Sequence, residues 1–279
     1  MPELPEVETV RCGLEHLLGP KALIVHAEVR RRDLRLPIPP EIPACLHGQA
    51  IRRVERRAKF LLWRLDGLTL INHLGMTGSW RQAQAEKAEK AADDREHDHV
   101  VLVLRDQRRL IYHDPRRFGL LTWCPPGQEM SHPWLARLGP EPLDTEAFTV
   151  DSLAAACARR SGPIKVAIMT AAVVVGVGNI YAAEALFRAG IRPATPARRV
   201  SRERLARLVA AIRDVLNEAI AAGGSTIRDF RQAGGSSGYF QTTFAVYGRG
   251  GEPCRACGTT LRHEVLGQRA TVWCPRCQR

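Results

Sequence analysis

The first residues of the chain combine two groups that could perform covalent chemistry. Pro2 would become the N-terminus if Met1 were removed, and its secondary amine would then stand beside the carboxylate of Glu3. An α-amine has a pKa of about 8, so part of it is neutral and nucleophilic at neutral pH. Such an amine can attack an aldehyde-like carbon and form an iminium, while the carboxylate transfers a proton. The same residues also suit an ordinary helix start, so alone they do not decide the function.

Four cysteines near the C-terminus have the spacing of a metal site. Two Cys-x2-Cys pairs are separated by sixteen residues, which is the pattern of a zinc ribbon. Four thiolates complete a tetrahedral shell, so the sequence predicts one structural Zn²⁺ rather than a hydrolytic one. The predicted ligands are Cys254, Cys257, Cys274 and Cys277. The remaining cysteines lack this spacing and are expected to be inert thiols.

Composition indicates a globular protein with a polyanionic partner. The chain has 279 residues, 45% of them hydrophobic, and its 41 Lys and Arg outnumber 29 Asp and Glu to give a net charge of +12. This excess favours nucleic acid over membrane, because no basic amphipathic helix or lipidation motif stands out. No apolar run is long enough for a membrane span, and a signal-peptide core is absent from the sequence. We therefore expect an intracellular protein, in which eight cysteines favour metal binding or inert thiols over disulfides.

The chain changes character along its length. Apolar residues at helical spacing predict an amphipathic helix over about 5–18, ended by Gly19-Pro20. Short alternating runs between 22 and 123 predict an antiparallel sandwich or barrel on which that helix packs. The charged stretch 81–96 is expected to be an exposed loop or a loose helix without chemistry of its own.

The sequence after Pro125-Pro126 is predicted to be helical. Helix-length segments begin near 152, 164, 179 and 201, and Ser201 is well placed to cap the last one. Asn179 is expected to be an N-cap, and Gly190 the residue just after the end of its helix. The turn VGVGN before this helix would present backbone N–H groups, which suit a phosphate, although any tight helical turn also needs glycines.

Taken together, these segments resemble the bacterial formamidopyrimidine-DNA glycosylases, which excise oxidised purines. The resemblance runs nearly end to end, and its motifs occur in the family's order. They are PELPEVET, RRAKFLL, HLGMTG, HDHV, DPRRFG, VGVGNIYAAE, GYFQ, VYGR and the four-cysteine ribbon.

The resemblance implies roles for individual residues. Pro2 would attack C1′ of the damaged nucleotide, and Glu3 would protonate the sugar ring oxygen, with Glu6 as a supporting carboxylate. Lys59 matches the lysine that contacts the damaged base and moves protons during elimination. Arg269 matches the arginine that holds a phosphate and assists the later elimination.

The resemblance also implies DNA contacts, because a base inside a duplex must be flipped out to be reached. Met76 and Phe118 would fill the gap and wedge the neighbouring step, and Arg116 would face the orphaned cytosine. His97 and Asn179 match further DNA-contacting positions. Ser161 stands where some relatives carry a DNA-contacting lysine, so that contact is transferred only by position.

Two other interpretations stay open. The endonuclease VIII branch uses the same nucleophile on oxidised pyrimidines, but the opening PELPEV and the glycine-rich segment AGGSSGYF favour the purine branch. That segment also departs from the usual pattern of its relatives, which leaves the lesion preference open. A zinc-ribbon DNA-binding protein without catalysis would fit the charge and the ribbon, but it would not need Pro2, Glu3 and Lys59.

We therefore predict an α+β, bifunctional DNA glycosylase/AP lyase in three parts. Residues 1–130 would form a β-sandwich with the N-terminal helix, 131–240 a helix-two-turn-helix domain, and 245–279 a zinc ribbon. DNA is expected to lie across the cleft between the first two parts. The predicted partner is double-stranded DNA with oxidised bases or abasic sites, bound by a cytoplasmic bacterial monomer without membrane contact.

Overall fold

Two packing units divide the chain. The structure, a computed structural model, describes residues 1–19, 22–83, 95–224 and 244–279. The first unit comprises Met1–Ala136 with Gly223–Tyr239, and the second comprises Arg137–Ala222 with Phe240–Arg279. The segment AGGSSGYF and residues 84–94 lie outside the described residues.

Helix α1 (Leu4–Leu18) opens the first unit, as the periodicity predicts. Glu3 and Glu6 form a capping box at its start, in which the backbone N–H of Glu3 donates to Glu6 Oε2 at 2.8 Å. The apolar side chains of Val7, Val10, Leu14 and Leu18 are buried in the core of the unit, whereas Leu17 is half-buried. Gly19 ends the helix with a φ of +65°, a conformation that favours glycine.

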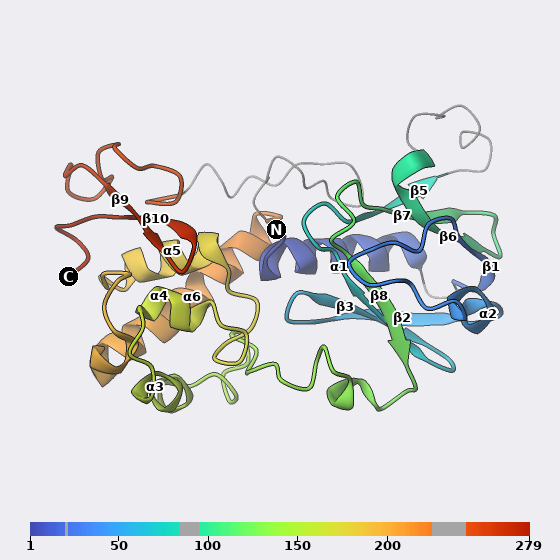
Figure 1. The fold of residues 1–279 in the computed structure, drawn as a ribbon, viewed down its shortest axis with the longest axis horizontal. Coiled ribbons are helices and arrows are strands. Elements are labelled where there is room, and N and C mark those ends of the chain that lie inside the picture. The colour runs from blue at the N-terminus through green and yellow to red at the C-terminus, as the bar shows by residue number, and fades with distance from the viewer. Residues whose placement is uncertain (20–21, 84–94, 225–243) are drawn as a thin grey trace. The chain divides into compact units, whose positions relative to one another are not determined.

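Two four-stranded antiparallel sheets form the rest of this unit (Figure 1). One sheet has the order β1-β6-β7-β5 and the other has the order β2-β3-β4-β8. The strands are β1 (Ile24–Val29), β2 (Ile51–Arg57), β3 (Phe60–Leu65), β4 (Thr69–His73), β5 (Ser79–Ala83), β6 (Asp98–Leu104), β7 (Arg109–His113) and β8 (Leu120–Cys124), with the short helices α2 (Ile42–Leu46), η2 (Arg95–His97) and η3 (Glu129–Ser131).

The two sheets share one core, so they form the predicted sandwich. Trp63 of β3 and Trp80 of β5 come from different sheets, and their rings lie 4.8 Å apart. The ring of Tyr112, on β7, lies 5.2 Å from that of Trp80, and all three rings are buried. Helix α1 packs on β2, β3 and β5, which fixes the N-terminus against the sandwich (Figure 1).

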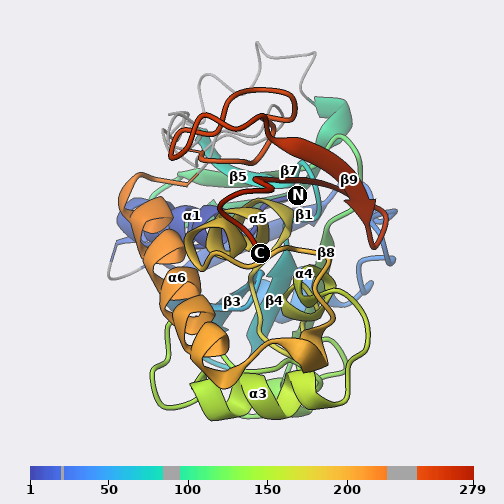
Figure 2. The same ribbon diagram turned by 90° about the vertical axis from the view of Figure 1, so that its left-hand side faces the viewer.

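The second unit is helical with a small β-hairpin (Figure 2). Helices α5 and α6 pack together, and Ser201 caps α6 by accepting a hydrogen bond from Arg204 N. The α6 stripe is buried from Leu205 to Leu216, whereas Ile220 is half-buried. The elements are α3 (Val150–Ala158), α4 (Ile164–Ile168), α5 (Asn179–Arg188), η4 (Ala197–Arg199), α6 (Arg202–Ala221), β9 (Arg262–Leu266) and β10 (Arg269–Trp273).

Three local predictions were wrong. Helix α4 ends at Ile168, and the rest of its segment forms turns up to the β-branched run Val173–Val175, whose residues are poor helix formers. Gly178, not Asn179, is the N-cap of α5, because the glycine takes the extended cap conformation and Asn179 begins the helix. Arg81–Ala83 complete strand β5 instead of starting a loop.

Among the described helices, none has the length and apolar character needed to cross a bilayer.

Candidate active site

The start of α1 holds the predicted nucleophile in a buried, charged environment. Pro2, Glu3 and Glu6 are all buried, although Glu3 and Glu6 are carboxylates. Burial lowers the pKa of the chain's α-amine, on Met1, from its ordinary value of 8.0. The carboxylates Glu3 and Glu6 oppose this shift, while the cations Lys59 and Arg116 reinforce it. The structure therefore brings the terminal amine within electrostatic reach of the predicted catalytic groups.

Lys59 occupies a two-residue hairpin turn between β2 and β3, where Arg57 pairs with Phe60. Its neighbour Ala58 has a φ of +56°, which favours glycine and is unusual for a residue with a Cβ. Arg56 supports the turn by donating to the carbonyl of Ala58 at 3.1 Å. Arg56 also donates to Glu8 of α1 at 2.9 Å, so the nucleophile helix and the lysine turn are tied together.

His73 lies at the end of β4, beside this turn, and its role was missed in the sequence. Its ring packs edge-on against Phe60 with centroids 4.9 Å apart. Burial, together with the cations Lys59 and Arg35, lowers the pKa of His73 to about 4. The neutral Nδ1 accepts a hydrogen bond from the backbone N–H of Gly75 at 3.0 Å. His73 therefore connects the lysine turn to the loop that carries Met76.

The predicted DNA-inserting residues lie on two adjacent loops, 74–78 and 114–119. A Cβ on Gly75 would come within 2.4 Å of the backbone of Phe118, so the loops touch through their main chains. The guanidinium of Arg116 stacks over the ring of Phe118 at 4.9 Å, and Phe118 is 47% exposed. Such exposure of a large aromatic side chain suits a wedge for stacked bases.

His97 lies next to the second of these loops. Its carbonyl accepts a hydrogen bond from the backbone N–H of Asp114 at 3.0 Å. Its half-buried ring packs against His113, with centroids 5.9 Å apart. The first unit therefore places His97 at the residue where the loop of Arg116 begins.

In the second unit, the hairpin β9–β10 places Arg269 beside Asn179. The turn between the strands is Gly267-Gln268, both with positive φ, and Arg269 follows it exposed on β10. Asn179 Nδ2 donates to the carbonyl of Ala270 at 3.2 Å. Ser161 is exposed in the segment before α4, and the structure does not bring it together with these two residues.

Lys165 fixes the same hairpin and was also missed in the sequence. Its side chain is fully buried, and Nζ donates to the carbonyl of Ala270 at 3.1 Å and to Thr271 Oγ1 at 2.7 Å. A Cβ on Gly267 would meet Val166 at 2.9 Å, so the turn of the hairpin also presses on α4. A lysine in a helical run is usually solvent-exposed, which is why the sequence carries no signal for this role.

The four predicted metal ligands converge in the second unit. Their sulfur atoms all lie within 4.8 Å of one another. Cys254 and Cys277 are 4.0 Å apart and Cys257 and Cys274 are 3.5 Å apart at Sγ. A tetrahedral zinc with Zn–S bonds of about 2.3 Å needs sulfur separations of about 3.8 Å, so the donor set fits Zn²⁺.

The ribbon is joined to α5 by a buried carboxylate. Glu184 accepts backbone hydrogen bonds from Ala245 at 2.8 Å, from Val246 at 3.0 Å and from Tyr247 at 2.8 Å. These contacts hold the chain where it begins the metal site.

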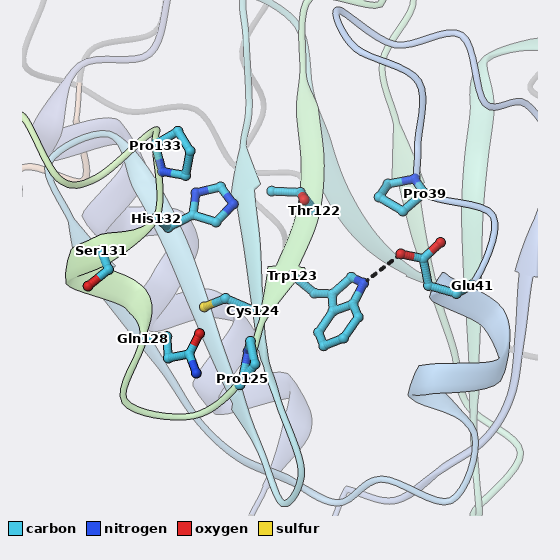
Figure 3. Close-up of a pocket in the computed structure, with 10 residues that line it drawn as sticks. All are labelled: Pro39, Glu41, Thr122, Trp123, Cys124, Pro125, Gln128, Ser131, His132 and Pro133. Atoms are coloured by element: carbon cyan, nitrogen blue, oxygen red, sulfur yellow. Dashed lines mark hydrogen bonds between the residues drawn. The ribbon is translucent and has the colours of Figure 1, made fainter.

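A separate hollow of about 410 Å³ lies along β8 in the first unit. Its walls include Trp123, whose Nε1 donates to Glu41 at 3.1 Å, and His132 (Figure 3). None of the predicted catalytic or DNA-contacting residues lines it. We therefore assign no part of the candidate site to this hollow.

Comparisons with known proteins find matches along most of the chain. Three family models match the chain: the formamidopyrimidine-DNA glycosylase N-terminal domain over 1–121, the H2TH domain of the same enzymes over 138–231, and a zinc finger found in FPG and IleRS over 251–279. The zinc-finger match and the sulfur geometry together identify one structural zinc site.

Similar proteins cover the whole chain. The formamidopyrimidine-DNA glycosylase of Bdellovibrio bacteriovorus is 50% identical, and that of Stenotrophomonas maltophilia K279a is 51% identical, each over 100% of both chains. The crystal structure of the MutM (Fpg) protein from Thermus thermophilus aligns with a TM-score of 0.86 at 42% identity, covering 99% of this chain and 98% of that one. The Lactococcus lactis Fpg in complex with abasic-site DNA aligns with a TM-score of 0.88 at 31% identity, covering 99% of each chain.

Proposed function

The chain belongs to the formamidopyrimidine-DNA glycosylase family, and from this membership we propose the lesion it removes and the residues that remove it. Membership makes it a DNA glycosylase and AP lyase of base excision repair. We propose that its substrates are oxidised purines, namely 8-oxoguanine and formamidopyrimidines, in double-stranded DNA. A solved relative from Lactococcus lactis binds DNA that contains Fapy-dG, which supports this choice over oxidised pyrimidines.

The reaction would begin at the secondary amine of Pro2 after Met1 is removed. The amine attacks C1′, the bond from C1′ to the base breaks, and the base leaves with a proton. Glu3 protonates the ring oxygen, the sugar ring opens, and an iminium joins Pro2 to the sugar. The observation that carries this proposal is the position of Pro2, which is buried at the start of α1 beside the buried carboxylates Glu3 and Glu6.

The strand would then be cut in two eliminations. Lys59, in the turn beside this amine, would move the protons of the first elimination, which expels the 3′ phosphate. Arg269 would hold the phosphate of the second elimination, which expels the 5′ side and releases the sugar. The hydrogen bonds of Lys165 and Asn179 to Ala270 hold the hairpin directly after Arg269 and support this assignment.

Access to the lesion would require the base to be flipped out of the duplex. Met76 and Phe118 would occupy the space it leaves, and Arg116 would face the orphaned cytosine. His97, Asn179 and Ser161 would contact the DNA backbone. The net charge of +12 supplies attraction for a polyanion.

We also infer that one chain acts alone in the bacterial cytoplasm. The curated relatives are bacterial enzymes, which supports the location. A DNA-binding protein without catalysis would have no use for an amine, a carboxylate and a lysine gathered at the N-terminus.

Borohydride trapping on a duplex with one 8-oxoguanine opposite cytosine tests the proposal. We expect a covalent adduct with the wild type, mapped to Pro2, and its loss by more than about a hundredfold in Glu3→Gln, the usual scale of a missing general acid. Pro2→Gly should leave only the adduct of a primary terminal amine. Trapping on thymine glycol alone would instead assign the chain to the pyrimidine branch.

Intact mass analysis is the control for this experiment. While Met1 is attached, the nitrogen of Pro2 is an amide and cannot attack a sugar. We expect a mass that lacks Met1. Retained Met1 in an active preparation would rule out the mechanism. No adduct on any lesion, with Met1 absent and duplex binding intact, would leave the non-catalytic interpretation.

A further inference from the structure

A buried hydrogen bond joins the two loops that carry the DNA-inserting residues. The hydroxyl of Thr77, on loop 74–78, donates to Asp114 Oδ1 at 2.5 Å. Asp114 begins loop 114–119 and is fully buried, and Thr77 is 9% exposed. A buried carboxylate is costly unless it is hydrogen-bonded, so this contact is strongly favoured where it occurs.

Both partners also hold the backbone of the second loop. The second carboxylate oxygen of Asp114 accepts from the backbone N–H of Gly119 at 2.8 Å. Thr77 Oγ1 accepts from the backbone N–H of Arg116 at 3.2 Å. One carboxylate and one hydroxyl therefore fix both sides of the segment that presents Arg116 and Phe118.

The remaining contacts of Asp114 anchor it to the sandwich. His99, itself fully buried, places Nε2 2.8 Å from the carbonyl of Asp114 and donates to it. The Asp114 N–H donates to the carbonyl of His97, and the Asp114 carbonyl also accepts from the N–H of Arg117 at 3.1 Å. The first residue of the loop is therefore held by hydrogen bonds on both its N–H and its carbonyl.

Glycines allow the two loops to pack closely against each other and against the sandwich. A Cβ on Gly119 would lie 2.0 Å from the hydroxyl of Tyr112, and one on Gly78 would lie 2.3 Å from the carbonyl of Leu74. Together with Gly75 against Phe118, these close approaches require a residue without a Cβ at all three positions. The position of Arg116 relative to Met76 is set by the hydrogen bonds just described.

We propose that Thr77 and Asp114 are positioning residues that couple the Met76 loop to the Arg116–Phe118 loop, so that the chain inserts them as one unit and reads the base opposite the lesion. This proposal rests on the proposed function, because it takes Arg116 to face that base. Neither residue touches the reacting atoms. They determine the position of Arg116 when the lesion base has left the duplex.

The test is Thr77→Val, which keeps the shape of the side chain and removes the hydroxyl. Single-turnover cleavage is measured on 8-oxoguanine paired with cytosine and with adenine. We expect the ratio of the cytosine rate to the adenine rate to fall by at least about tenfold, because the variant loses both hydrogen bonds of the hydroxyl, to Asp114 and from the backbone of Arg116. Thr77→Ser restores the hydroxyl and should restore the ratio.

The chain offers a matched control in Thr69→Val. Thr69 is also buried, and its hydroxyl donates to the buried carboxylate of Glu129 at 2.5 Å, but it lies at the far end of β4 from the inserting loops. Thr69→Val should lower the stability by a similar amount and leave the ratio unchanged. An equal change in the ratio for both variants would show a general loss of stability and overturn the proposal.

Two further measurements separate this proposal from the function on which it rests. Cleavage of a single-stranded abasic oligonucleotide needs no opposite base, so Thr77→Val should retain the wild-type rate there. Fluorescence of a cytosine analogue opposite the lesion should report weaker insertion in the same variant. A wild type inactive on every substrate would reject the proposed function, whereas an active wild type with an unchanged ratio and fluorescence in Thr77→Val would reject only the coupling.

Discussion

The protonation of His73 depends on its burial and on the charges around it. Burial and the nearby cations Lys59 and Arg35 lower its pKa to about 4, so the ring is neutral at physiological pH. Only the neutral ring can accept the hydrogen bond from Gly75 at Nδ1. Acid therefore breaks a contact that supports the loop of Met76.

The stability of the protein should consequently depend on pH through His73. The folded-state pKa of about 4 lies below the ordinary value of 6.5, so the unfolded chain binds more protons between these values. The free energy of unfolding should fall as pH falls from 6.5 to 4 and should level off below that range. Urea unfolding of wild type and His73→Asn across this range checks the prediction. The asparagine keeps an acceptor for Gly75 but does not titrate, so the difference between the two curves isolates the histidine; a flat difference would contradict it.

Residues with chemical signatures were easier to predict than residues that support them. The four cysteines could be identified as metal ligands because their spacing alone defines the site. Lys165 and Asp114 could not be recognised as buried, because a helical lysine and an aspartate before proline are both common at the surface. Their roles depend on partners that are far away in the sequence, as with Lys165 and Thr271.

Among the elements, the C-terminal end of α1 and the middle of α5 make long-range hydrogen bonds that their sequences do not predict. Arg108, one of several clustered arginines, donates to the carbonyls of Leu17 and Leu18 at the end of α1. A cation at this end also suits the helix dipole. On α5, Glu184 holds three backbone N–H groups of the segment that leads into the ribbon.

Replacing one carboxylate oxygen of Glu184 should destabilise the contact between α5 and the segment that leads into the ribbon. Glu184→Gln keeps the shape, but it replaces the charge and one acceptor oxygen, so at least one buried N–H loses its partner. We expect a loss of about 2 kcal/mol in the free energy of unfolding. Urea unfolding of the zinc-loaded protein checks this value. Glu203→Gln is the control, since Glu203 is 84% exposed in its ion pair with Arg207 and its loss should be within about 0.5 kcal/mol.

Helix periodicity predicted α1 and α6 well because both have long apolar stripes that pack on a core. It failed for α4, since the apolar run continues past Ile168 although the backbone turns there. Apolar side chains in a buried turn and in a buried helix look alike in the sequence. Three-dimensional packing alone distinguishes them.

At the scale of the whole molecule, the 41 Lys and Arg overstate the number of cations available to a ligand. Arg56 is 11% exposed and paired with Glu8, and Arg108 donates hydrogen bonds to the carbonyls at the end of α1. Arg52 and Arg53 are more than half exposed, yet each forms an ion pair with a nearby carboxylate. The charges of the paired arginines are largely cancelled by their partners, so the net excess of +12 is what a polyanion meets at long range.

Affinity for undamaged duplex should therefore be strongly salt-dependent. If about six or more phosphates are neutralised, the affinity should fall about a thousandfold between about 50 mM and about 200 mM salt. Fluorescence anisotropy with a labelled duplex at several NaCl concentrations gives the slope. A slope near zero would mean that the charge excess has no role in DNA binding.

The main-chain contact between loops 74–78 and 114–119 limits how this protein could be redesigned. Gly75, Gly78 and Gly119 each lie where any added side-chain atom would overlap a neighbouring group. A mutant library that aims at a new opposite-base preference should vary Met76, Arg116 and Phe118 and keep those glycines fixed. Nearly every library member with a substituted glycine would lose the fold of the loops before its selectivity could be screened.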